Sequence, residues 1–124
     1  MSATGGRSIE TRVRSLCVAL PGVVEKISHG APAFFAGRQF VMLWPKGHHD
    51  HDFTHLWCAA PAGAQETFVE SDPGRYFRPP YVGGRGWLGV RLEGIVDWDE
   101  VEMLCEDAYR TVASKKLLAE LDRS

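Results

Sequence analysis

Residues 23–45 read VVEKISHGAPAFFAGRQFVMLWP, and this stretch decides the fold. Its β-branched and aromatic residues, interrupted by Gly30, Pro32 and Gly37, are typical of two or three short antiparallel strands. Gly37-Arg38 is the expected hairpin turn between AFFA and QFVMLW. A polar loop follows, and THLWCAA at 54–60 predicts a further strand. We therefore expect an antiparallel sheet built from these segments.

One helix is predicted before these strands and one after them. An apolar stripe at helical spacing, ended by Pro21-Gly22, predicts a helix before the strands, with Ser8 as its N-cap. The members of the stripe are Ile9, Val13, Leu16, Cys17 and Leu20. After the strands, Pro61 is expected to open a second helix that runs through Val69 and stops at the DPG sequence of residues 72–74.

The C-terminal part of the chain predicts two strands and two helices. Strands are expected at Tyr76–Arg78 and Trp87–Leu92, around a Pro-Pro and a Gly-Gly break. Asp97 is expected to cap a long helix, with Glu100 three residues on completing a capping box. The apolar stripe of this helix is Val101, Leu104, Cys105, Ala108 and Val112. Ser114 is expected to cap a last short helix.

The order of elements is thus helix, three strands, helix, two strands, helix, without the βαβ alternation that builds a parallel sheet. This order predicts a two-layer α+β fold in which helices back one face of an antiparallel sheet. The 124 residues suffice for one domain, which we expect at residues 8–124, and residues 1–7 are expected to be disordered.

Composition and charge exclude several classes of protein. The chain is 44% hydrophobic and 24% charged, which is typical of a soluble globular domain. No apolar run approaches the roughly 20 residues of a membrane-spanning helix, and the N-terminus lacks the apolar region of a signal peptide. Three widely spaced cysteines, Cys17, Cys58 and Cys105, argue against a disulfide framework and for buried thiols. We expect a cytoplasmic protein without a membrane partner or a cofactor.

The segment from Arg75 to Arg91 carries four arginines and no acidic residue, interleaved with aromatic rings. Guanidinium groups beside flat rings suit an anionic, planar partner such as nucleic acid. The candidate nucleic-acid-binding residues, including two lysines that would extend the patch, are Arg75, Arg78, Tyr81, Arg85, Trp87, Arg91, Lys115 and Lys116. An ordinary hairpin with a solvated basic face is the other interpretation, because an acidic run follows directly and the net charge is −2.

Five segments cover almost the whole chain and carry a family resemblance. They are LPGVVEKISHGAPAFF at 20–35, FVMLWP at 40–45, HLWCAAPAGAQE at 55–66, RYFRPPYVGGRGWLGVRL at 75–92 and DWDEVEMLCEDAYRTVASKKLLAEL at 97–121. Together they resemble the MmcQ/YjbR family of small bacterial proteins. The resemblance implies an α+β fold like that of frataxin (CyaY-like) and the secretion chaperones, with a curved antiparallel sheet backed by helices. It also implies a DNA-binding role, and no enzymatic activity comes with it.

A histidine-rich loop and a Ser-His pair come closest to metal or catalytic chemistry. The sequence HHDHDFTH at 48–55 combines imidazole and carboxylate, which suit Zn²⁺, Ni²⁺ or Cu²⁺. No rigid element holds this loop, so we expect only adventitious metal binding there. Ser28 and His29, as neighbours on a strand, are expected to point to opposite faces and form no nucleophile–base hydrogen bond. No catalytic residue and no dedicated metal site is therefore predicted.

These observations favour a non-enzymatic cytoplasmic binding module whose partner is DNA. Arg78, Arg85 and Arg91 would contact phosphate, while Tyr81 and Trp87 would supply flat contact area. The alternative is a protein- or small-ligand-binding, chaperone-like domain that holds an apolar guest on the concave face of the sheet. That alternative predicts an apolar cleft, and its expected lining is Phe35, Phe40 and Trp57. An enzyme that uses the histidine loop with a metal ranks last.

Overall fold

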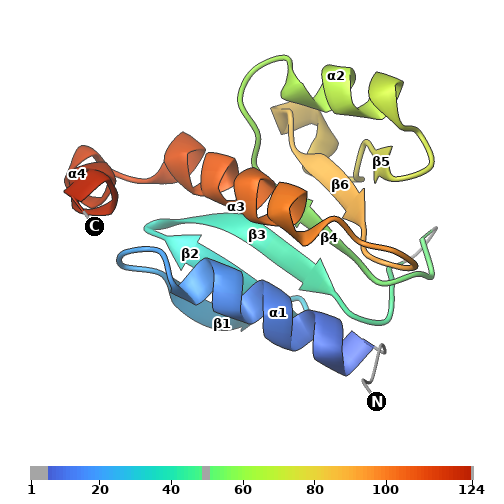
Figure 1. Cartoon of the computed structure of the whole chain (residues 1–124), viewed down its shortest axis with the longest axis horizontal. Coiled ribbons are helices and arrows are strands. Elements are labelled where there is room, and N and C mark those ends of the chain that lie inside the picture. The colour runs from blue at the N-terminus through green and yellow to red at the C-terminus, as the bar shows by residue number, and fades with distance from the viewer. Residues whose placement is uncertain (1–5, 49–50, 124) are drawn as a thin grey trace.

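A computed structural model describes residues 6–48 and 51–123. Within them, six strands form one antiparallel sheet in the order β1-β2-β3-β4-β6-β5, accompanied by four α-helices (Figure 1). The elements are α1 (Gly6–Val18), β1 (Val24–Ser28), β2 (Ala31–Ala36), β3 (Arg38–Trp44), β4 (His55–Cys58), α2 (Ala64–Ser71), β5 (Tyr76–Phe77), the 3₁₀ helix η1 (Gly83–Arg85), β6 (Leu88–Arg91), α3 (Trp98–Val112) and α4 (Lys115–Arg123). The predicted two-layer α+β fold is confirmed.

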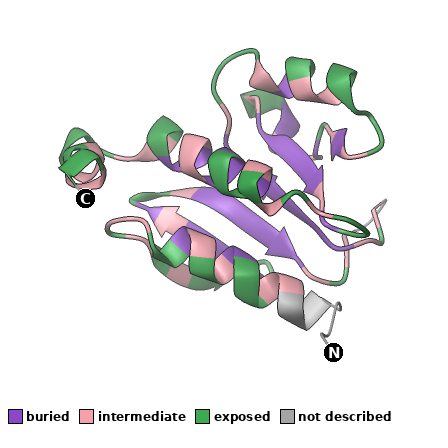
Figure 2. Ribbon diagram, viewed as in Figure 1, coloured by how far each residue is buried: buried purple, intermediate pink, exposed green. Residues whose placement is uncertain are grey.

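The core lies between one face of the sheet and the helices α1 and α3 (Figures 1 and 2). Val13 and Cys17 are fully buried on α1, and the Tyr109 ring on α3 meets the Phe40 ring on β3 edge to face at 5.7 Å. Burial of these apolar side chains is the main stabilising contribution to such a fold. In contrast, α4 has no buried residue. None of the described helices is long and apolar enough to cross a lipid bilayer.

Several element boundaries differ from the prediction. Residues 24–44 form three strands, so four strands rather than three precede α2. Because α1 begins at Gly6, the expected N-cap Ser8 and residues 6–7 of the expected disordered segment belong to the helix, whereas residues 1–5 lie outside the described part of the chain. Helix α2 begins at Ala64 instead of Pro61, because the Pro61 carbonyl accepts the Ala64 amide in a turn before the helix.

Helix capping was predicted in part. Asp97 accepts a hydrogen bond from the Glu100 amide at 3.2 Å, which confirms the N-cap of α3. The Glu100 carboxylate does not complete the capping box; it accepts the hydroxyl of Tyr76 and so joins α3 to β5. Ser114 caps α4 as expected, since its Oγ accepts the Leu117 amide at 3.2 Å.

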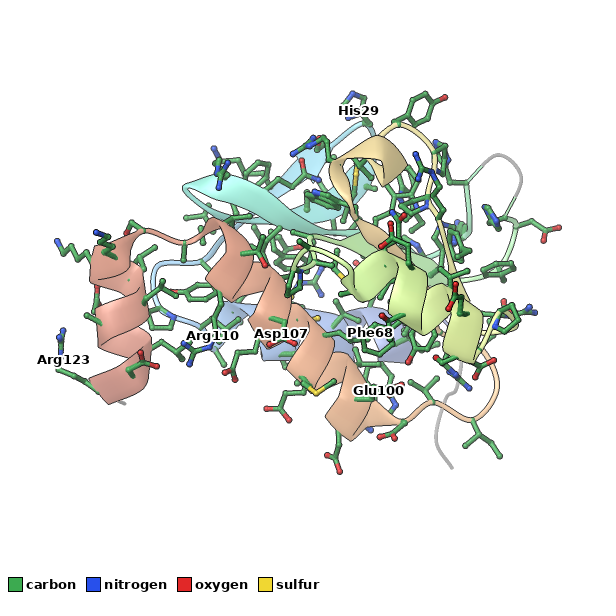
Figure 3. All side chains as sticks on the ribbon, turned by 90° about the horizontal axis from the view of Figure 1, so that it is seen from above. His29, Phe68, Glu100, Asp107, Arg110 and Arg123 are labelled. Carbon is green, nitrogen blue, oxygen red and sulfur yellow. The ribbon has the colours of Figure 1, made fainter. Side chains whose placement is uncertain are left out.

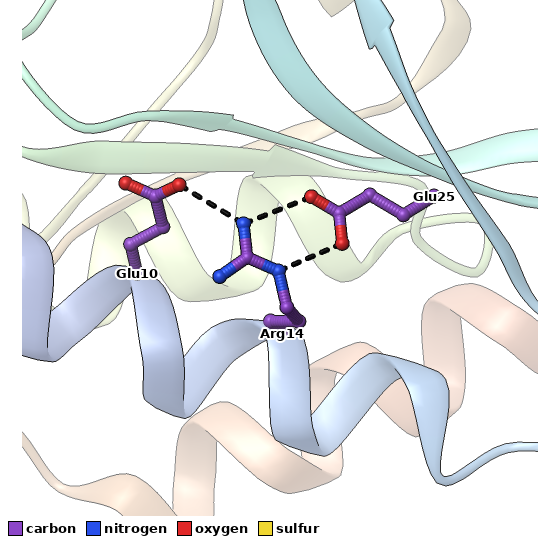
Figure 4. A network of polar contacts seen from close by, with 3 residues as sticks. All are labelled: Glu10, Arg14 and Glu25. Atoms are coloured by element: carbon purple, nitrogen blue, oxygen red, sulfur yellow. Dashed lines mark hydrogen bonds and ion pairs between the residues drawn. The ribbon is translucent and has the colours of Figure 1, made fainter.

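Arg14 fastens α1 to the edge strand β1 (Figure 4). Its Nε and Nη2 donate to the two carboxylate oxygens of Glu25 at 2.7 and 2.9 Å, and Nη2 also donates to Glu10 at 3.0 Å. A bidentate guanidinium–carboxylate pair fixes direction as well as distance. The hydrogen bond from Arg14 lowers the pKa of Glu25, which keeps the pair charged at neutral pH.

A bulge decides which side chains of β3 face away from the helices. The register of β2 and β3 shifts between the pairs Phe34↔Val41 and Phe35↔Gln39, which leaves Phe40 as the extra residue. A bulge interrupts the strict alternation of side chains along a strand. Phe40 therefore contacts α3, while Met42 lies opposite Trp57 of β4 on the other side of the sheet. We call this second side, away from the helices, the open face.

Candidate functional site

The eight residues predicted to bind nucleic acid fall into three separate places. Arg75 and Arg91 form the first, at a polar hollow of about 350 Å³ that Asp72 and Glu93 also line. Arg91 Nη2 lies 3.5 Å from Glu93 Oε1, and Arg75 donates to the carbonyl oxygen of Ile95 at 2.9 Å. The two carboxylates offset much of the positive charge at this place.

Lys115 and Lys116 form the second place, on α4. Figure 1 shows α4 at the end of the molecule opposite β5 and β6. The structure therefore does not bring these lysines together with the arginines. The reason is the course of the chain, because the 15-residue helix α3 separates the β6 end of the sheet from α4.

The loop of residues 78–87 is the third place, and the buried side chain of Gln65 on α2 holds it. The Gln65 amide nitrogen donates to the carbonyl oxygens of Gly83 at 2.9 Å and Trp87 at 2.5 Å, and its oxygen accepts from Arg78 at 3.4 Å. Arg85 places its guanidinium 5.4 Å from the centre of the Trp87 ring. Among the described residues, neither Arg78 nor Arg85 forms an ion pair with a carboxylate.

The two aromatic residues predicted to offer flat contact area differ in exposure. Tyr81 is 77% exposed, whereas Trp87 is only 4% exposed. Trp87 therefore offers little exposed ring area, contrary to the expectation that it would supply flat contact area. Its main-chain carbonyl oxygen accepts the hydrogen bond from the buried side chain of Gln65.

Tyr81, Arg85 and Trp87 come together in the wall of a pocket of about 500 Å³ on the open face. We call it the aromatic pocket, and its other lining residues are His29, Gln39, Met42, Trp44, His48, Trp57 and Val82. None of these residues lies in α1–α4. The volume falls within the range of small-molecule sites. Of the three cleft residues expected for the chaperone-like alternative, Trp57 lines the pocket, but Phe35 and Phe40 do not. The bulge turns Phe40 toward α3.

On one side of the aromatic pocket, the ring of His48 contacts three other aromatic side chains. The His48 ring centre lies 4.2 Å from that of Trp44, 5.2 Å from Trp57 and 6.1 Å from Tyr81. The indole nitrogens of Trp44 and Trp57 are buried and have no acceptor among the described residues. A buried donor without an acceptor costs about 1–3 kcal/mol. Functional sites are among the places where such orphaned groups are tolerated.

Backbone strain gathers at the same pocket. His29 and Tyr81, with φ of 53° and 64°, are the two described non-glycine residues with positive φ, and both line the pocket. For a bulky residue such as tyrosine, this conformation is an outlier that the surrounding structure must hold in place. Figure 3 shows His29 on the side of the molecule opposite Glu100 and Asp107 of α3.

The turn at His29 also corrects the prediction for Ser28. The Ser28 Oγ and His29 Nδ1 atoms lie 3.1 Å apart, within hydrogen-bond distance. Strand alternation would have separated them, but His29 has left the strand and its positive φ turns the ring back. The pair sits at an exposed turn and includes no third group among the described residues that would orient the imidazole.

The histidine loop contributes ring packing. His51 stacks on Phe77 at 4.1 Å, and the fully buried His55 hydrogen-bonds through Nδ1 to the Phe53 carbonyl at 2.8 Å. Burial lowers the pKa of His55 to about 4, so its ring is neutral. Within residues 6–48 and 51–123, no three His, Cys, Asp or Glu side chains are grouped to hold a metal; His49 and Asp50 lie outside these ranges.

The three thiols are buried, as predicted. Burial raises the pKa of Cys58, and a hydrogen bond with Cys105 together with burial raises that of Cys17. Thiols with raised pKa values are poor nucleophiles.

The sequence model of the YjbR family matches residues 18–111. The chain belongs to the YjbR family. The fold of this YjbR-family chain is similar to that in the crystal structure of the Deinococcus radiodurans protein DR2400, which carries the domain DUF419. The TM-score is 0.70 at 19% sequence identity, over 89% of this chain and 85% of that one, and this likeness shows the fold alone. No curated protein is significantly similar to the chain.

In this YjbR-family chain, residues of two apolar strands form much of the aromatic pocket. Trp44 lies on β3 and Trp57 on β4. The signal that points to a second face is the alternation in β3, where Gln39, Met42 and Trp44 line the pocket while Val41 and Leu43 are fully buried. Only the bulge at Phe40 brings Gln39 into phase with the other two.

Proposed function

We propose that this protein is a non-enzymatic binding module that holds a small planar molecule in the aromatic pocket. The observation that carries the proposal is the pocket of about 500 Å³ with three tryptophans in its wall. Ligand sites are concave and mostly apolar, with a few polar groups that fix orientation. The aromatic pocket has this composition, because Gln39, His29 and Arg85 stand among rings and aliphatic side chains.

The chemistry of the surrounding residues supports binding over catalysis. The buried thiols have raised pKa values, and His55 is neutral and does not line the pocket. The Ser28–His29 contact lacks a described group that would orient the histidine ring, and such orientation is part of the serine–histidine mechanism. The pocket instead offers ring faces, which suit the recognition of a flat molecule.

Filling the pocket tests this proposal. Val82 lines the aromatic pocket and is half-buried, so Val82→Phe would place a ring where the ligand is expected. We expect the wild-type protein to bind 2-naphthamide, an uncharged bicyclic ring, and Val82→Phe to bind it at least about tenfold more weakly, because each 1.4 kcal/mol of lost contact is tenfold. Quenching of tryptophan fluorescence and isothermal titration calorimetry both report the binding.

Val24→Phe is the matched control, because Val24 is 51% exposed on β1 and does not line the pocket. The same change of side chain there leaves the affinity unaltered if the pocket is the site. Equal affinity in Val82→Phe and wild type, or the absence of any binding, would overturn the proposal.

Duplex DNA is the second candidate partner, and the exposure of Arg78 and Arg85 favours it. Both guanidinium groups lie beside η1 without a carboxylate partner in the described part of the chain. Phosphate contacts from such arginines are independent of sequence and sensitive to salt. Either partner fits the cytoplasmic location expected from the sequence.

A further inference from the structure

Among the described residues that line the aromatic pocket, one carries a permanent charge, and this charge is positive. Of the ten lining residues, Arg85 carries the guanidinium, and none is an aspartate or a glutamate. Arg85 has no ion pair among the described residues, and its guanidinium is held against the Trp87 ring at 5.4 Å. A guanidinium on an aromatic face keeps its N–H donors available in the plane of the group. The pocket therefore places the Arg85 guanidinium, without a carboxylate partner among the described residues, beside an apolar surface.

The rest of the lining adds ring surfaces. The ring centres of Trp44 and Trp57 lie 5.0 Å apart. Ring edges and faces at this spacing favour a flat aromatic guest, through offset and edge-to-face contacts.

Aromatic pockets of this kind also occur as cages for quaternary ammonium ions, where ring faces attract a cation. The charge distribution decides between the two guests here. Among the described lining residues, a cation in this pocket would meet Arg85 and no carboxylate, so these residues would repel it. An anionic group would instead form a charge-assisted hydrogen bond with the guanidinium, and these are among the stronger contacts in proteins.

We propose that the aromatic pocket binds a planar aromatic anion, with its ring against Trp44, Trp57 and Trp87 and its anionic group on Arg85. This inference rests on the proposed function and names the class of its ligand: an aryl carboxylate, sulfonate or phosphate. Strain at His29 and Tyr81, which line the same pocket, is consistent with a site held ready for a ligand.

Three probes that share one ring system and differ in charge test whether the ligand is an anion. They are 2-naphthoate, 2-naphthamide and 2-naphthyltrimethylammonium, titrated into the wild-type protein by calorimetry. We expect the carboxylate to bind about tenfold more tightly than the amide and the ammonium ion to bind most weakly, because a hydrogen bond to a charged group is worth about a factor of ten or more. Added salt should weaken only the naphthoate, since its advantage is electrostatic.

Two matched variants test whether Arg85 causes the preference for naphthoate over naphthamide. Arg85→Gln removes the charge but keeps a polar side chain, and we expect naphthoate and naphthamide to bind it within about twofold of each other, since the charge-assisted contact is gone. Arg38→Gln makes the same change at an exposed arginine that does not line the pocket, and the tenfold preference should persist.

The outcomes separate this inference from the proposed function. Tightest binding of the ammonium probe, or a preference for naphthoate that survives in Arg85→Gln, would overturn the inference that the ligand is an anion bound by Arg85. Either result would still support the binding of a planar molecule in the pocket. Absence of binding by all three probes would overturn both. Circular dichroism of each variant establishes that the fold is intact.

Discussion

Tyr81 stores backbone strain at the mouth of the aromatic pocket, where its φ is 64° and its side chain is 77% exposed. Asparagine tolerates this conformation far better than tyrosine. We expect Tyr81→Asn to raise the free energy of unfolding by about 1 kcal/mol, because it relieves strain while little packing is lost. Urea denaturation measures the change, and the affinity for 2-naphthamide should fall in the same variant.

Tyr81→Phe is the control for this prediction. Phenylalanine has the same difficulty with positive φ, so this variant should show no gain in stability. A gain of similar size in both variants would show that the hydroxyl group, and not the backbone, accounts for the effect.

His55 makes stability depend on pH. Its pKa is lowered from 6.5 to about 4 in the folded protein, so the unfolded chain binds more protons between these values. The stability contribution of the neutral ring is complete above about pH 6.5 and is lost as the pH falls toward 4. A depression of this size corresponds to about 3 kcal/mol. Urea denaturation at a series of pH values measures the loss.

His55→Asn keeps a short side-chain donor for the Phe53 carbonyl but cannot titrate. The pKa of Glu25 is also shifted in the folded protein, lowered by its hydrogen bond with Arg14, so the prediction concerns the difference between wild type and variant. Identical slopes of stability against pH in the two proteins would contradict the assignment.

At the scale of elements, a single amide connects α2 with η1 and the start of β6. Gln65 donates to the Gly83 and Trp87 carbonyls and is 5% exposed. We expect Gln65→Ala to lower the free energy of unfolding by about 1–3 kcal/mol, because two carbonyl oxygens lose a donor in a buried place. Thermal denaturation measures this loss.

Gln65 does not line the aromatic pocket, yet it positions Trp87 and the loop that carries Arg85. Gln65→Ala should therefore also weaken the binding of 2-naphthoate under conditions in which the variant is fully folded. Glu70→Ala on the same helix, at an exposed position, should change stability by less than about 0.5 kcal/mol. A stable Gln65→Ala variant with unaltered binding would contradict the positioning role.

At the scale of the whole molecule, two of the three groups of candidate basic residues lie at opposite ends. Arg85 is the last residue of η1 and Arg78 lies against Gly83 of η1, whereas Lys115 and Lys116 lie on α4 at the opposite end (Figure 1). If duplex DNA binds at η1, Arg78→Ala with Arg85→Ala should weaken binding to random-sequence duplex and reduce the slope of log affinity against log salt by about 1–2. Fluorescence anisotropy at several salt concentrations gives the slope.

Lys115→Ala with Lys116→Ala removes the same number of charges and should leave that slope unchanged. Equal effects of the two double variants would indicate attraction by net charge alone and would reject a docking surface at η1. The acidic residues on α3 make such nonspecific attraction weak, since the net charge is −2.

Much of the fold could be predicted from the sequence because its signals are local. The apolar stripe of α1, the Gly37 turn between β2 and β3 and the Asp97 cap of α3 each depend on residues close together in the chain. The three buried thiols followed from their apolar neighbours in the same way. What failed at this level were boundaries, such as the start of α2, where the turn at Pro61–Gly63 outweighed the preference of proline for the first helical turn.

By itself, then, the sequence determined most of the elements, the α+β class and the family, but not the number of strands before α2. Hydrophobic periodicity and turn residues act over a few positions, which is why these features could be predicted. The tertiary structure alone decided the site. A one-residue bulge at Phe40 sets which side chains of β3 face away from the helices, and Gln65, which is 22 residues before Trp87 in the chain, donates to the main-chain carbonyl of Trp87. Arg85 thereby meets Trp44 and Trp57 in one pocket, while Lys115 and Lys116 are carried to the other end. Such contacts depend on pairing between strands that are distant in sequence and on packing across the sheet. A short window of sequence contains no information about either.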